Sequence, residues 1–167
     1  IRHVVKAAGP TGEHESSTFA DEFLAALAAA PDWLIVDEIR GDESKAVWAA
    51  LNHENPPHYL WVFRGNAQAD RLRSALSMVI RKGYPLLDQA TIYEAIAARV
   101  PFVAVIKRVE DAPCLVQIAE WVYKDGAEVT LTLRPILVEH EGGWLDMEQR
   151  PTRNLDLPDE FWGDKRA

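Results

Sequence analysis

Two kinds of apolar pattern alternate along the first two thirds of the chain. Apolar residues at helical spacing predict four helices, over 19–30, over the residues that follow 41–43, over 67–82 and over 88–99. Short continuous apolar runs predict a strand buried on both faces at 33–36, a second buried strand at 59–63 and a third strand at 102–106. Strands that alternate with helices predict an α/β fold with a three-layer, mainly parallel sheet and right-handed crossovers.

The pattern changes after Val109. Apolar stretches over 114–123 and 128–138 are separated by turn residues at 124–126 and followed by more at 141–143, which is typical of an antiparallel β-meander. We therefore expect an α/β core over 1–109, an appended antiparallel β extension over 110–146 and a polar tail over 147–167.

Composition and charge exclude several classes of protein. The 167 residues are 48% hydrophobic and 26% charged, as in globular proteins, and the net charge of −8 opposes direct nucleic-acid binding. No apolar run is long enough to span a membrane. The single cysteine, Cys114, excludes an internal disulfide, and the five histidines lack metal-ligand spacing.

The strongest candidate chemistry follows the apolar run 33–36. Asp37 and Glu38 come directly after this predicted buried strand, and the carboxyl ends of parallel strands are where open α/β sheets bind ligands. In nucleotide hydrolases such a pair serves Mg²⁺ and the attacking water. The alternative interpretation is a core strand followed by a solvated acidic turn.

The chain contains no convincing phosphate-binding loop. The stretch 9–16 has the length and flanking residues of a G-x-x-x-x-G-K-[ST] loop. His14 replaces the second glycine, however, and Glu15 replaces the lysine that neutralises phosphate. We interpret this stretch as an ordinary loop.

A longer pattern surrounds the acidic pair. Thr-Phe-Ala-Asp at 18–21 and Ala-Ala-Leu at 25–27 precede Ala-Pro-Asp, the hydrophobic strand and Asp-Glu-Ile-Arg-Gly over 30–41. Asn-Ala and Asp-Arg-Leu within 66–72 follow, and then a helix and an apolar strand over 92–107. Over about residues 15–122 the chain resembles the Walker B region of the secretion-ATPase superfamily, the ring-shaped motors of type II and type IV secretion, pilus assembly and conjugation.

The resemblance assigns roles to four residues. Glu38 matches the Walker B glutamate that polarises the attacking water, and Arg40 matches the arginine two positions later. Asp37 replaces a glycine and would help to hold Mg²⁺. Arg64 stands at the position of the family's His-box histidine, where it would meet phosphate or the adjacent subunit, and Val62 replaces a hydroxyl residue.

What the resemblance implies for the whole protein goes further. It implies a partial RecA-like sheet, ATP and Mg²⁺ as cofactors, a hexameric ring, and secretion or pilus components of the bacterial inner membrane as partners. It also implies a cytoplasmic protein at the periphery of that membrane. Without a Walker A loop we expect this chain to be the C-terminal part of a motor that does not hydrolyse ATP alone. The alternative is a degenerate, non-hydrolysing interaction subunit of similar machinery.

Three weaker features have ordinary explanations beside functional ones. The basic residues of the predicted helix 67–82 could form an interface or phosphate patch, or a solvated helix face; they are Arg71, Arg73, Arg81 and Lys82. His53 and His58 flank two prolines in a predicted surface loop. Trp162 is a candidate for docking against a neighbouring molecule.

Overall fold

The computed structural model describes residues 18–39, 43–65, 68–140, 143–146 and 149–156, with the backbone alone for 140 and 143–146. The stretch 9–16, Arg40 and Trp162, which carry sequence predictions, lie outside the described residues. The chain divides into two compact units. The first consists of 1–100 with 123–131, and the second of 101–122 with 132–167.

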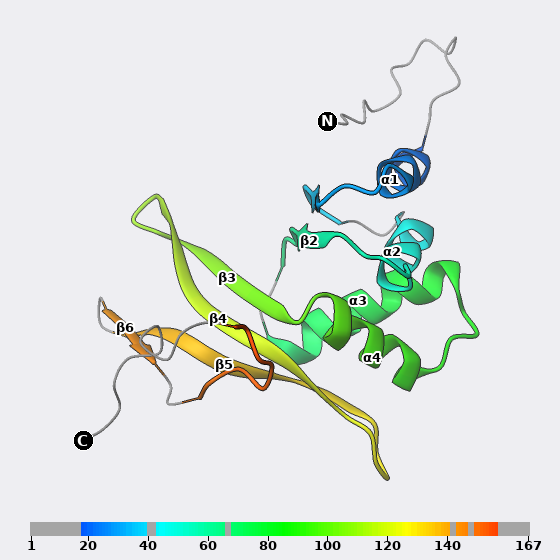
Figure 1. The fold of residues 1–167 in the computed structure, drawn as a ribbon. Coiled ribbons are helices and arrows are strands. Elements are labelled where there is room, and N and C mark those ends of the chain that lie inside the picture. The colour runs from blue at the N-terminus through cyan, green and yellow to red at the C-terminus, as the bar shows by residue number, and fades with distance from the viewer. Residues whose placement is uncertain (1–17, 40–42, 66–67, 141–142, 147–148, 157–167) are drawn as a thin grey trace. The chain divides into compact units, whose positions relative to one another are not determined.

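The described part of the first unit contains four helices (Figure 1). They are α1 (Phe19–Ala28), α2 (Ser44–Leu51), α3 (Ala69–Gly83) and α4 (Gln89–Arg99). Helix α2 contacts the other three, and its apolar side is buried because it faces them. The core of this unit comprises Phe23, Leu27, Ala46, Val47, Ala50, Leu51, Leu76, Ile80, Ile92 and Ile96.

Local sequence explains where two of these helices begin. Thr18 and Asp21 form a capping box before α1: the Thr18 hydroxyl accepts the Asp21 N–H, and the Asp21 carboxylate accepts the Thr18 N–H. Asp88 caps α4 by accepting the N–H of Thr91 at 2.9 Å. Gly83, the last residue of α3, allows close packing against α2. A Cβ at this position would lie 2.9 Å from the Ser44 hydroxyl oxygen.

The first unit also contains a parallel pair of strands, β1 (Trp33–Val36) and β2 (His58–Trp61). Their register pairs Trp33 with His58 and Val36 with Trp61. The α/β alternation and the parallel direction of these two strands agree with the sequence prediction.

The second unit is built on an antiparallel sheet in the order β3-β4-β5-β6, visible in Figure 1. Its strands are β3 (Phe102–Val109), β4 (Ala112–Lys124), β5 (Thr130–His140) and β6 (Gly143–Asp146). The tip of the β4–β5 hairpin, 123–131, belongs to the first unit. Sequential neighbours pair throughout, so the predicted antiparallel meander is present.

The prediction for the third strand was wrong. We expected 102–106 to join the parallel sheet, but β3 pairs antiparallel with β4, from Phe102 opposite Glu120 to Val109 opposite Ala112. A two-residue turn at 110–111 connects them, and both turn residues have left-handed backbones, with φ of 46° and 66°. A tight hairpin brings β4 beside β3, so this apolar run lies in a different sheet from β1 and β2.

Candidate functional site

Two of the predicted site residues, Glu38 and Arg64, lie beside each other. Glu38 follows β1 and Arg64 follows β2, and these strands are parallel and adjacent, so both residues lie at the same carboxyl end. The Nε atom of Arg64 is 3.5 Å from Oε2 of Glu38, which makes an ion pair. The structure therefore brings the two predicted catalytic residues together at the edge where open α/β sheets bind ligands.

The backbone at Glu38 is constrained. Its φ of 65° lies in the left-handed region, which is uncommon for a residue with a side chain. The Ile39 N–H donates to the Val62 carbonyl at 2.9 Å, and the Val62 N–H donates to the Val36 carbonyl at 3.0 Å. The parallel hydrogen-bond ladder thus continues on both sides of Glu38. The Glu38 side chain is 19% exposed and that of Arg64 is 81% exposed, so the guanidinium is far more open to solvent than the carboxylate.

Among the described residues, the carboxylates at the end of β1 do not form a metal site by themselves. Asp37 is exposed at the end of β1, beside the partly buried Glu38, and Arg40 lies outside the described residues. Within the described ranges, no group of three or more His, Cys, Asp or Glu side chains could hold a metal ion. A Mg²⁺–nucleotide site uses one or two carboxylates and takes its other ligands from phosphate oxygens and water. Asp37 and Glu38 can supply that number of carboxylates.

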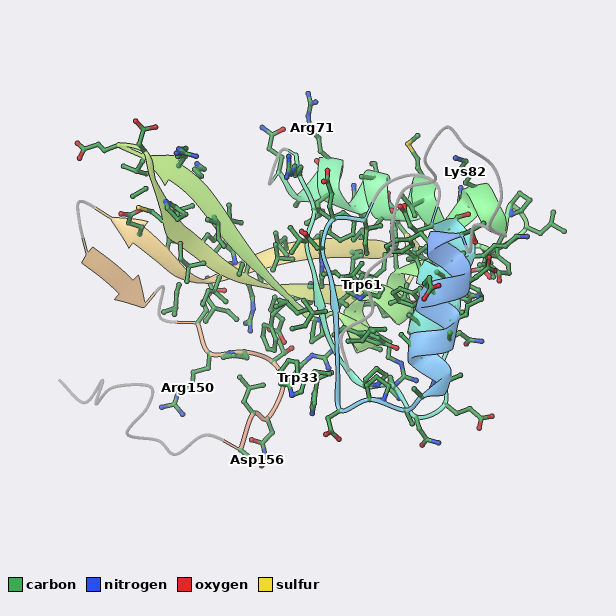
Figure 2. The ribbon with its side chains drawn as sticks, turned by 90° about the horizontal axis from the view of Figure 1, so that it is seen from above. Trp33, Trp61, Arg71, Lys82, Arg150 and Asp156 are labelled. Carbon is green, nitrogen blue, oxygen red and sulfur yellow. The ribbon has the colours of Figure 1, made fainter. Side chains whose placement is uncertain are left out.

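One face of the β1–β2 pair is exposed, in contrast to the prediction that the first strand is buried on both faces and the second is buried too. Trp33 is 61% exposed, Ile35 65% and Leu60 52%, and Ile35 lies directly opposite Leu60 in the register. Trp33, labelled in Figure 2, contacts the His58 ring across the strands with centroids 4.8 Å apart. Val36 points to the other face and is 4% exposed. No described element of the first unit covers the first face, which explains the difference.

The basic residues of α3 do not form one patch. Arg73 turns inward: its guanidinium donates to the Leu131 carbonyl at 2.9 Å, pairs with Asp70 at 2.7 Å and lies over the Tyr93 ring. Arg71 is two positions away and therefore lies on the opposite side of the helix, pointing outward in Figure 2. Three of the four basic residues are exposed, namely Arg71, Arg81 and Lys82. Arg73 has a structural role that the sequence pattern did not reveal.

A shallow hollow of about 350 Å³ lies at the other end of the parallel strands. It is lined by 30–32 and 55–58, which lie at the amino ends of β1 and β2. His58, predicted to lie in a loop, is the first residue of β2. The hollow is therefore separate from the carboxyl ends where Glu38 and Arg64 meet.

Sequence reasoning missed a buried carboxylate in the second unit. Glu120 on β4 is fully buried. It accepts hydrogen bonds from Arg134 at 3.0 Å and from the Thr152 N–H and hydroxyl at 2.8 and 2.7 Å, and Arg153 lies 3.8 Å away. Burial would raise the Glu120 pKa, but these bonds outweigh it and lower the pKa below its ordinary 4.5. A charge inside the apolar run 118–122 was the available signal.

The end of α2 depends on two side chains from elsewhere in the first unit. Arg99 donates to the carbonyls of Leu51 and His53 at 3.2 Å each, and the Tyr59 hydroxyl donates to the Ala50 carbonyl at 2.8 Å. Burial raises the pKa of Tyr59 to about 12 despite the nearby positive charge of Arg99. These contacts tie α2 to α4 and β2 and so hold the strand that leads to Arg64.

Comparison with known proteins identifies no family: no family model matches the chain, and a search of curated proteins finds no match. Among the described residues, no helix is both long and apolar enough to cross a bilayer.

Proposed function

We propose that this chain is part of a nucleotide-hydrolysing motor that resembles the secretion ATPases. The observation that carries the proposal is the meeting of Glu38 and Arg64 at the carboxyl ends of two parallel strands. The sequence resemblance assigns a functional role to each of these two residues. A carboxylate for the attacking water and an arginine for phosphate charge are two parts that many nucleotide-hydrolysing sites use.

In this proposal each residue has one task. Glu38 orients and polarises the attacking water, and Arg64 contacts the terminal phosphate. Asp37, which is exposed next to Glu38, holds Mg²⁺ or one of its waters, and Arg40 contacts phosphate or the adjacent subunit. Mg²⁺ would neutralise charge that develops on the phosphate oxygens. ATP binding also requires a phosphate cradle, which an upstream half would supply.

The exposed apolar face of β1 and β2 supports the larger architecture. Parallel sheets are covered on both faces in α/β proteins, and here Trp33, Ile35 and Leu60 remain exposed. A further layer over this face would complete the three-layer, RecA-like arrangement. We further propose the hexameric ring, the inner-membrane secretion or pilus partners and the cytoplasmic, membrane-peripheral location that the resemblance implies.

The second candidate is a non-hydrolysing subunit of the same kind of machinery. The ion pair itself favours it, because Arg64 stands at the expected histidine position and engages the very carboxylate that hydrolysis would use. In that case the Glu38–Arg64 pair would only join the ends of β1 and β2.

Steady-state ATP hydrolysis distinguishes the two candidates. The measurement uses a polypeptide in which an upstream nucleotide-binding half precedes this chain, with circular dichroism to confirm folding. The motor proposal predicts hydrolysis that depends on Mg²⁺. A folded, oligomeric protein without hydrolysis would support the interaction subunit and overturn the motor.

A further inference from the structure

The contact between Arg64 and Glu38 is weak for an ion pair. Charge-assisted N–H···O bonds are usually about 2.7–2.9 Å long, whereas the Arg64 Nε lies 3.5 Å from the Glu38 carboxylate. The arginine is 81% exposed, and exposed pairs contribute little to stability. This pair can therefore open at small cost.

The two partners differ in freedom. Hydrogen bonds of Ile39 and Val62 hold the backbone on both sides of Glu38, whereas Arg64 follows the end of β2 and precedes Gly65. A Cβ at Gly65 would meet nothing within 4 Å, so this part of the loop is unobstructed. If the pair opens, Arg64 is the residue that moves.

We propose that Arg64 is a phosphate-responsive latch on Glu38. In the nucleotide-free chain the guanidinium of Arg64 forms an ion pair with the Glu38 carboxylate. The terminal phosphate of a nucleoside triphosphate, with greater charge and three acceptor oxygens, draws the guanidinium away, because planar guanidinium groups bind phosphate oxygens in a bidentate manner. The Glu38 carboxylate then acts on water only when phosphate is present. This inference rests on the proposed function, since it concerns regulation of the same site.

In this latch the Glu38 carboxylate and phosphate compete for the guanidinium of Arg64. Neutralising the carboxylate removes the competitor, so phosphate should bind Arg64 more tightly in Glu38→Gln protein. A structural ion pair with no role toward phosphate predicts no such gain beyond the general effect of removing one negative charge from the protein.

The test uses the full chain and inorganic phosphate. Phosphate is titrated while the Nε–H signal of Arg64 is followed by NMR, with Arg64→Lys used to assign that signal. We expect a saturable shift in the wild type and about two- to fivefold tighter binding in Glu38→Gln. Arg81→Ala removes an exposed arginine of α3 and should change nothing. Glu54→Gln removes an exposed carboxylate elsewhere and should change the affinity by much less than Glu38→Gln.

Two outcomes overturn the latch: phosphate leaves the Arg64 signal unmoved, or Glu38→Gln binds phosphate no better than Glu54→Gln. Either result is separable from failure of the proposed function, which is read from hydrolysis in the longer polypeptide. Hydrolysis that requires Glu38, combined with equal phosphate affinities, rejects the latch alone. Tighter phosphate binding in Glu38→Gln, combined with no hydrolysis in the longer polypeptide, rejects the motor proposal alone.

Discussion

Thr152 anchors its chain segment to the sheet of the second unit through one side chain, Glu120. The carboxylate of Glu120 accepts both the backbone N–H of Thr152, at 2.8 Å, and its hydroxyl, at 2.7 Å. Arg134 contributes from β5 to the same carboxylate and also donates to the Arg150 carbonyl. A single fully buried carboxylate thus joins β4, β5 and the segment around 150–153.

Replacing Glu120 by alanine should destabilise the second unit and release this segment. The substitution leaves Thr152 and Arg134 without their shared acceptor, and we expect a loss on the order of 2 kcal/mol in the free energy of unfolding. Urea denaturation measures the loss, and limited proteolysis near 150–153 measures the release. Glu139→Ala, at an exposed position of β5, should cost less than about 0.5 kcal/mol. Equal effects of the two substitutions would refute the anchoring role.

The same carboxylate should make stability depend on pH in the acid range. Because the folded state lowers the Glu120 pKa below 4.5, its contribution is complete above that value and is lost as the pH falls through the lower folded-state pKa. The difference in unfolding free energy between wild type and Glu120→Gln should shrink across this range. The capping carboxylates Asp21 and Asp88 also have lowered pKa values, but they are present in both proteins. A difference that stays constant with pH would contradict the prediction.

Tyr59 should ionise at unusually high pH. Its pKa of about 12 predicts that the last tyrosine step in an ultraviolet titration disappears in Tyr59→Phe. Since the folded pKa is raised from 10.0, the stability linked to Tyr59 is complete below pH 10 and declines as the pH rises through the folded value. The substitution should cost about 1 kcal/mol at neutral pH, because the Ala50 carbonyl keeps a bond from the His53 N–H. Loss of a step near the ordinary tyrosine pKa of 10.0, in place of the last step, would show that Tyr59 is solvated.

Two isoleucine substitutions test the uncovered sheet face. Ile35 on β1 is 65% exposed, whereas Ile92 on α4 is fully buried. We expect Ile35→Ala to cost less than about 1 kcal/mol in this chain and Ile92→Ala about 2–5 kcal/mol. Thermal or urea unfolding measures both. A cost at Ile35 as large as that at Ile92 would mean that the face is covered in solution.

Local sequence signals predicted the parts of the fold that depend on local interactions. The capping residues Thr18 and Asp88 begin helices where expected, and the run 33–36 forms a strand. The partner of a strand is decided by other segments, so the run 102–106 was recognised as a strand but placed in the wrong sheet. The burial of a strand likewise depends on the elements that cover it. The apolar run 33–36 by itself does not specify those elements.

In the candidate site, too, local sequence predicts some features, whereas others depend on distant segments. The acidic pair after β1 can be recognised because it follows a predicted strand, whereas only the family resemblance points to Arg64. Their contact could not be predicted from spacing, since it depends on the parallel register of β1 and β2. The roles of Arg99 and Arg73 depend on carbonyl groups distant in sequence, and nothing in their own segments indicates those partners.

The rate of ATP hydrolysis in Glu38→Gln protein tests the central claim most directly. It is measured in the longer polypeptide beside the wild type and the Glu54→Gln control, with folding and oligomeric state checked for each. Because a group that activates the attacking water contributes roughly 10²–10⁴-fold to the rate, we predict a loss of that size in Glu38→Gln and none in the control. Hydrolysis by Glu38→Gln at the wild-type rate would contradict the account.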